Sequence, residues 1–91
     1  MAVKKVRWPK LDPDSGVEDA TLLILEWLGE QGVDALIRVD AERIQAGQPA
    51  WTFVASGGQL ADAVRTDGVS AAECMGRALF TLREAGLSVP F

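Results

Sequence analysis

The sequence predicts a small α+β domain with a two-layer α-β-β-(β)-α architecture, in which two helices pack on one face of a short antiparallel sheet. Two amphipathic segments near the ends each open with a Ser-x-x-Glu capping box. Short strand-like segments separated by glycine and proline lie between them. The 91 residues, 48% of them apolar and 24% charged, suit a single globular domain. We therefore divide the chain into an extended basic arm (1–14), one α+β domain (15–87) and an apolar C-terminal tail (88–91).

The arm carries an unusual share of the positive charge. Its basic residues are Lys4, Lys5, Arg7 and Lys10. Pro9 and Pro13 disfavour a helix here, so we expect an extended segment, with an edge strand over residues 3–8 as an alternative. Trp8 is expected to fold back onto the domain.

The first helix is predicted over residues 16–31. Ser15 and Glu18 form its capping box, and Gly32 is a typical residue after a helix C-terminus. Its apolar residues cover an arc of roughly 200°, wider than one contact with a sheet requires. Leu22 lies outside this arc, among acidic residues. The helix is therefore expected to contact a second surface, which could be the other helix, the arm or another chain.

A hairpin is predicted in the middle of the chain. Residues 34–43 alternate between apolar and polar side chains, the period of a half-buried strand. Arg38, Asp40 and Glu42 share its polar side with Leu36. Residues 45–49 contain glycine and proline and predict a turn. Residues 50–56 include tryptophan, phenylalanine, threonine and valine, which favour a strand.

A third, weaker strand is predicted over residues 61–66. Asp67 and Gly68 are typical of a turn that leaves it. Three alanines weaken the strand prediction, and residues 60–64 are also compatible with a helical turn.

The second helix repeats the signals of the first. Ser70 and Glu73 form its capping box, and Gly86 follows its C-terminus. Cys74 belongs to its apolar stripe, whereas Phe80 lies on its polar side. The apolar tail that follows is expected to tuck against the core, with presentation to a partner as the alternative.

The residue types leave little room for catalysis, metal binding or a cofactor. The chain has no histidine and no tyrosine, and a single cysteine permits no internal disulfide. Cys74 is expected to act as a small buried hydrophobe, with thiol reactivity as a minor alternative. Asp62 and Asp67 could form a carboxylate pair, but such acids are usually solvated surface residues, and no histidine, lysine or glycine-rich phosphate loop accompanies them. We therefore predict a non-catalytic protein that needs no cofactor and no metal.

Charge and hydropathy bound the environment and the partners. The net charge is −4, and outside the first ten residues five arginines stand against all thirteen acidic residues. An acidic body repels phosphate backbones, which makes nucleic acid an unlikely partner for it. The longest apolar run, residues 22–25, is too short to span a bilayer. We expect a cytoplasmic protein without a membrane partner.

The order helix, strand, strand, probable strand, helix resembles the layout of double-stranded-RNA-binding domains. That family places lysines at the start of its second helix to contact phosphates. This chain has Ser70, Ala71, Ala72 and Glu73 there. The segment 68–74, Gly-Val-Ser-Ala-Ala-Glu-Cys, is similar to the opening of the helix in HicB-type antitoxins. That resemblance implies a small acidic protein that works by covering a toxin.

These observations favour a protein-interaction module, either antitoxin- or immunity-like or self-associating, that binds through apolar and acidic surface. The partner is expected to be another protein or a second copy of the chain. The candidate partner-binding residues are Leu22, Phe80, Asp40 and Glu42. The alternative is a nucleic-acid-binding module, in which the basic arm contacts phosphates and a base stacks on its tryptophan. Its candidate residues are Lys4, Lys5, Arg7, Trp8 and Lys10.

Overall fold

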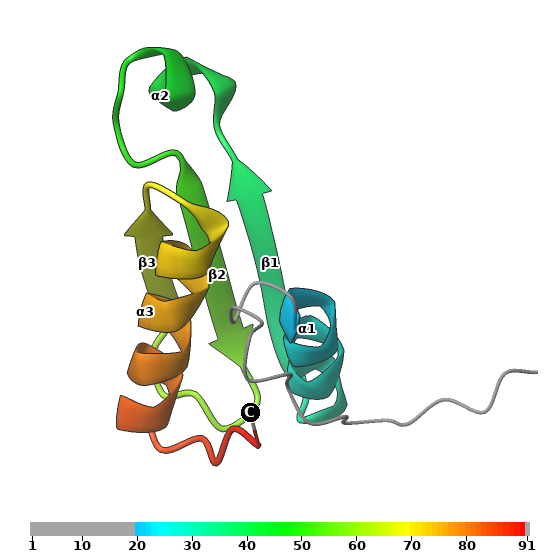
Figure 1. Cartoon of the computed structure of the whole chain (residues 1–91). Helices are drawn as coiled ribbons and strands as arrows, with labels where there is room; N and C mark the ends of the chain where they lie inside the picture. Colours follow the sequence, from blue (N-terminus) through cyan, green and yellow to red (C-terminus); the bar gives the residue numbers. More distant parts are fainter. Residues whose placement is uncertain (1–19, 91) are drawn as a thin grey trace, which may run out of the picture.

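The computed structural model describes residues 20–90, so the basic arm lies outside the described residues. The elements along the chain are α1 (Thr21–Glu30), β1 (Val33–Val39), α2 (Ala41–Gln45), β2 (Trp51–Gly57), β3 (Val64–Gly68) and α3 (Ala71–Glu84) (Figure 1). The three strands form one antiparallel sheet. The predicted α+β class is confirmed. The third strand, which the sequence predicts only weakly, is present as β3.

β2 is the central strand of the sheet, and β1 and β3 flank it. Ala55 of β2 pairs with Ala35 of β1 and with Val64 of β3. The connection between β1 and β2 contains α2, which projects from the end of the sheet (Figure 1). Within the described residues, the outer side of β1 pairs with no other strand.

α1 and α3 cover the same face of the sheet, as predicted. α1 packs on β1, and α3 packs on β3 and β2 (Figure 1). The side chains that fill this layer are buried and apolar, and Phe53 of β2 lies at their centre with no exposed surface. The helical part of this core consists of Ile24, Leu28, Cys74, Met75, Ala78, Leu79 and Leu82. No described helix covers the opposite face, which we call the open sheet face.

The first helix begins later than predicted. α1 starts at Thr21, and Ala20 before it makes no side-chain capping hydrogen bond. The predicted capping box of Ser15 and Glu18 lies outside the described residues. The predicted end is confirmed, because Gly32 has a φ of +79°, a conformation that glycine adopts without steric cost.

The first strand ends earlier than predicted. β1 stops at Val39, because the Asp40 carboxylate accepts hydrogen bonds from the backbone of Glu42 and Arg43 and so caps α2. The expectation that Asp40 and Glu42 project from one strand face was wrong. Capping by an aspartate competes with strand extension, and here it prevails.

The third strand lies further along the chain than predicted. β3 spans Val64–Gly68, so Asp67 and Gly68 are strand residues and not a turn. Gly68 permits the close approach of β3 to α3, since a Cβ atom here would lie 2.5 Å from the Cys74 nitrogen. The absence of a side chain therefore serves packing at this position and not chain reversal.

The second predicted helix is confirmed. Ser70 accepts a hydrogen bond from the backbone of Glu73, and Glu73 in turn accepts one from the backbone of Val69. This is a capping box that satisfies backbone groups at the start of α3. Gly86 follows the helix with a φ of +96°. Beyond it, Leu87 is buried and Val89 packs against the core.

Candidate functional site

The open sheet face combines an apolar centre with charged side chains. Because side chains alternate along a strand, residues next to the core positions project onto this face. They are Asp34, Leu36 and Arg38 of β1, Thr52, Val54 and Ser56 of β2, and Arg65 and Asp67 of β3. The register aligns Leu36, Val54 and Arg65 in one row across the sheet, and Arg38, Thr52 and Asp67 in the next.

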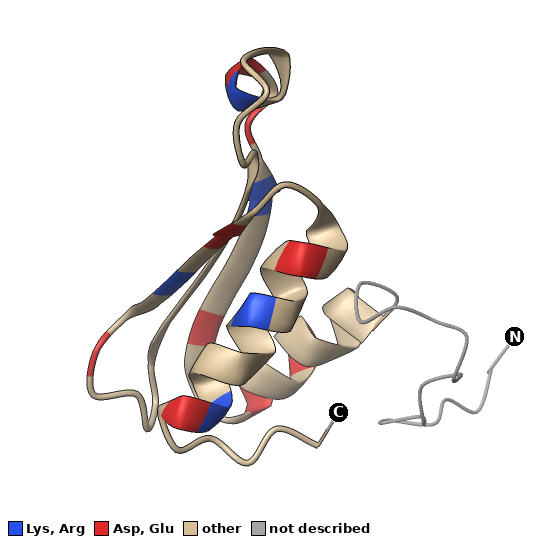
Figure 2. Ribbon diagram, turned by 60° about the vertical axis from the view of Figure 1, so that its left-hand side comes forward, with Lys and Arg blue, Asp and Glu red and all other residues tan. Residues whose placement is uncertain are grey.

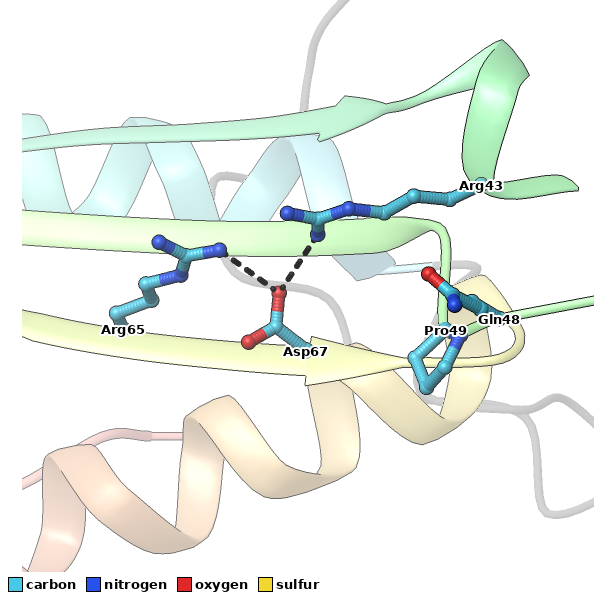
Figure 3. Close-up of a pocket in the computed structure, with 5 residues that line it drawn as sticks. All are labelled: Arg43, Gln48, Pro49, Arg65 and Asp67. Atoms are coloured by element: carbon cyan, nitrogen blue, oxygen red, sulfur yellow. Dashed lines mark hydrogen bonds and ion pairs between the residues drawn. The ribbon is translucent and has the colours of Figure 1, made fainter. Parts of the chain in front are cut away.

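Asp67 is the centre of a polar cluster on this face (Figure 3). The Thr52 hydroxyl donates a hydrogen bond of 2.7 Å to Asp67 Oδ1. Arg65 and Arg43 place guanidinium nitrogens 3.4 and 3.5 Å from the same oxygen. The hydrogen bond from Thr52 and the two arginines hold the pKa of the Asp67 carboxyl below its ordinary value, against an opposing effect of burial.

α2 brings Arg43 to this cluster. Asp40 Oδ1 caps the helix by accepting hydrogen bonds of 3.0 and 3.2 Å from the backbone nitrogens of Glu42 and Arg43. Asp40 Oδ2 lies 3.5 Å from an Arg38 nitrogen and 3.7 Å from Nε of Arg43. One aspartate therefore both starts α2 and links it to the end of β1.

A shallow pocket lies beside the cluster. Its lining residues are Arg43, Gln48, Pro49, Arg65 and Asp67 (Figure 3). The Asp67 carboxylate already lies between the two guanidinium groups, so the pocket presents both donors and acceptors. Such an arrangement suits hydrogen bonding to a polar partner more than binding of an isolated anion.

The open sheet face and α2 beside it carry three arginines and four acidic residues, so their charges nearly balance. Arg38, Arg43 and Arg65 stand against Asp34, Asp40, Glu42 and Asp67. Figure 2 shows positive and negative residues interspersed over the sheet and α3, without a segregated basic patch on the described part of the chain. This distribution is typical of the rim of a protein interface and not of a phosphate-binding surface.

The structure places the predicted apolar candidates on two different helices. Leu22 of α1 is 79% exposed, and Phe80 of α3 is 66% exposed. Asp40 and Glu42 lie at the start of α2, where only Asp40 joins the arginine cluster. The nucleic-acid candidates of the arm, Lys4, Lys5, Arg7, Trp8 and Lys10, lie outside the described residues.

The open sheet face was missed in the sequence. The alternation of β1 placed Leu36 and Arg38 on its polar side, which suggested solvent exposure and nothing more. The position of Asp67 on a strand was hidden by the Asp-Gly pair, which is typical of turns. The signal that could have found the face is the presence of two charged residues of opposite sign, two or four positions apart, on the outward side of each outer strand. They are Asp34 and Arg38 in β1, and Arg65 and Asp67 in β3.

Cys74 is structural. Its side chain is fully buried, and burial raises the pKa of the thiol, with an opposing effect from the hydrogen bond to Thr66. Thr66 also donates a hydrogen bond of 3.2 Å to the Cys74 carbonyl oxygen. The thiol therefore lies in the contact between β3 and α3, protonated and shielded.

Within residues 20–90, no three cysteine and acidic side chains gather as a metal site, and no helix is long and apolar enough to cross a bilayer. No protein-family model matches the chain, and no characterised protein or solved structure is significantly similar to it. The function proposed below therefore rests on the geometry of the chain itself.

Proposed function

We propose that this chain is a non-catalytic protein-interaction module that binds its partner through the open sheet face and the adjoining edge of β1. The observation that carries the proposal is the pattern on that face. Leu36 is 50% exposed and lies beside Val54, and balanced arginine and aspartate residues surround this pair. An apolar centre with a polar, arginine-containing rim is the usual anatomy of a protein–protein interface.

The acidic character of the chain supports a partner that is itself basic. Outside the arm the acidic residues outnumber the arginines, and Glu26 and Glu84 lie exposed on the outer surfaces of α1 and α3. Electrostatic attraction of this kind accelerates association and disfavours acidic competitors. A small acidic protein that covers a basic enzyme or toxin, as an antitoxin or immunity protein does, fits these properties.

Nucleic-acid binding is the second candidate, and the helix–strand–strand–strand–helix layout favours it by resemblance. It would depend on the arm, because all three lysines of the chain lie within residues 1–10. The arginines of the open sheet face each lie within 3.7 Å of an aspartate oxygen. Neutralised arginines release few counterions from a phosphate backbone.

The test compares surface variants for partner capture. Purified wild-type chain is used to capture proteins from its native host, and each captured protein is then titrated in purified form. We expect Leu36→Lys to abolish binding, whereas Phe80→Lys, at a similarly exposed position on α3, leaves it intact. Circular dichroism checks that both variants are folded. A partner lost on Phe80→Lys but retained on Leu36→Lys would refute the assignment to the open sheet face.

An oligonucleotide-binding assay separates the two candidates. The protein-interaction proposal predicts no salt-dependent binding to single- or double-stranded oligonucleotides. Binding that disappears when residues 1–10 are deleted, without a protein partner that depends on Leu36, would favour the nucleic-acid candidate.

A further inference from the structure

Within residues 20–90, the backbone groups on the outer edge of β1 pair with no other strand, and the register identifies them. The Asp40 nitrogen donates a hydrogen bond of 2.9 Å to the Ala50 carbonyl, which continues the register between β1 and β2. In an antiparallel pair, hydrogen-bonded residues alternate, so Asp34, Leu36 and Arg38 also bond towards β2. The intervening residues direct their N–H and C=O groups to the outer edge. They are Val33, Ala35, Ile37 and Val39.

We propose that two copies of the chain pair through this edge, antiparallel, about a two-fold axis at Leu36, and form one continuous six-stranded sheet. This inference rests on the proposed interaction function and assigns the outer edge of β1 to a second copy, which leaves the open sheet face available to the basic partner. β1 contains no proline and no lysine, the residues that commonly protect an edge strand. Among residues 20–90 no strand pairs with this edge of seven residues, which can therefore serve as a template for strand pairing.

The proposed register makes β1 complementary to itself. Leu36 is the middle residue of the strand, so a two-fold axis there places it opposite Leu36 of the second copy. Asp34 then faces Arg38 of the second copy, and Arg38, which also lies 3.5 Å from its own Asp40, faces Asp34 of the second copy. These are non-hydrogen-bonded pairs, in which the Cα atoms approach to about 4.5 Å and the side chains are closest. Two opposite-charge pairs therefore flank an apolar contact on the open sheet face.

Other registers lose this complementarity. A slide by one residue would flip side chains to the wrong face and misalign the free backbone groups. The smallest allowed shift, by two residues, places Arg38 opposite either Leu36 or Gly32. The next shift places Arg38 opposite Arg38, or Asp34 opposite Asp34. Only the axis at Leu36 pairs all seven residues and matches both charges.

The helix-covered face of β1 supports the same arrangement. Along this face Val33 is 2% exposed, Ala35 and Ile37 are half-buried, and Val39 is 47% exposed. Figure 1 shows the reason, because α1 lies beside the end of β1 that contains Val33, and the strand continues beyond the helix towards α2. The uncovered part of β1 is therefore the end that contains Val39.

A two-fold axis perpendicular to the sheet would place α1 of the second copy on this same side. It would lie over the end of β1 that the chain's own α1 leaves bare. Val39 and its cross-strand neighbour Trp51, which is half-buried, would then be covered. The opposite charges on the open sheet face and the exposed apolar surface on the helix-covered face are therefore both satisfied by a second copy in the same register.

The test is sedimentation velocity on the full chain over a range of concentrations. The wild-type chain is expected to sediment at twice its mass of 9.7 kDa. Asp34→Arg alone and Arg38→Asp alone each place like charges opposite one another twice, which should weaken dimerisation about tenfold or more. An equimolar mixture of the two variants should dimerise again, because every introduced charge then faces its opposite. The double variant Asp34→Arg/Arg38→Asp should also dimerise.

Each remaining outcome overturns the proposal. It fails if the wild-type chain stays monomeric at several hundred micromolar, if either single charge reversal leaves the dimer unchanged, or if the mixture does not restore it. Dissociation by Phe80→Asp or Leu22→Asp would assign the contact to the helices instead. A wild-type monomer that still binds another protein through Leu36 would overturn this inference and leave the proposed function standing. Circular dichroism of each variant excludes unfolding as the cause.

Discussion

Substitution of Gly68 by alanine should destabilise the domain through one local clash. Gly68 is the last residue of β3, and a Cβ atom built there lies 2.5 Å from the Cys74 nitrogen and 2.9 Å from its Cα. Both are backbone atoms of α3, so no side-chain rotation relieves the contact. Gly68 does not have a positive φ, so the effect is one of space and not of backbone conformation.

The magnitude follows from the need to separate β3 from α3. Overpacking of a core by one methyl group costs typically about 1–3 kcal/mol. In a domain of this size, each kcal/mol corresponds to a change in melting temperature of about 4–8 °C. We therefore expect Gly68→Ala to unfold at least several degrees below the wild-type chain and at a lower urea concentration.

Gly76 provides the matched control. It lies within α3, is exposed, and a Cβ atom there meets nothing within 4 Å. Gly76→Ala should stabilise the chain by about 1 kcal/mol, because alanine favours the helix. Urea unfolding followed by tryptophan fluorescence measures both variants. A Gly68→Ala midpoint equal to that of the wild-type chain, with the expected increase for Gly76→Ala, would refute the close packing of β3 and α3.

Three further predictions concern the cap, the polar cluster and the thiol. Ser70→Ala removes the acceptor for the Glu73 backbone and should cost about 1 kcal/mol in urea unfolding. Folding lowers the pKa of Asp67, so its contribution is present above the ordinary value of 3.8 and is lost as the pH falls through the folded value. The difference in unfolding free energy between the wild-type chain and Asp67→Asn should therefore shrink from pH 6 to pH 3, and a constant difference would contradict the cluster. Burial raises the pKa of Cys74, so iodoacetamide at pH 8 should label it slowly in the native chain and fast in urea.

The sequence predicts most of the fold because its strongest signals are local. The capping box of Ser70 and Glu73 fixes the start of α3, and Gly32 and Gly86 mark the ends of the two long helices. Each of these signals depends on a few neighbouring residues and one backbone geometry. The antiparallel pairing of β1 and β2 was also predicted, because strands that follow one another in sequence usually lie side by side, and it persists although their connection contains α2.

The errors arise where one residue type serves two structures. Asp40 fits the polar side of a strand and the N-cap of a helix, and the alternation of residues 34–43 does not distinguish them. Asp67 and Gly68 predict a turn, because aspartate followed by glycine favours turn conformations of the backbone. In the structure Asp67 is held by Thr52, and Gly68 is required by the approach of Cys74. Both partners are distant in sequence, so no local rule identifies them.

The candidate site was hidden for a related reason. A sequence pattern gives the two faces of a strand, but it does not say which strand lies at the edge of the sheet. From the sequence alone, β1 could have a neighbouring strand on each side. The face that contains Asp34, Leu36 and Arg38 then resembles an ordinary solvent-exposed face. Within residues 20–90 the sheet order makes β1 an edge strand, and its bounds place Leu36 at the centre. Asp34 and Arg38 then lie at equal distances on either side of Leu36 and have opposite charges. A strand that needed only solubility would gain from a lysine on its edge, and this one has an apolar residue between opposite charges. That choice of residues is the physical reason to look for the second copy at β1 before looking for it at Leu22 or Phe80.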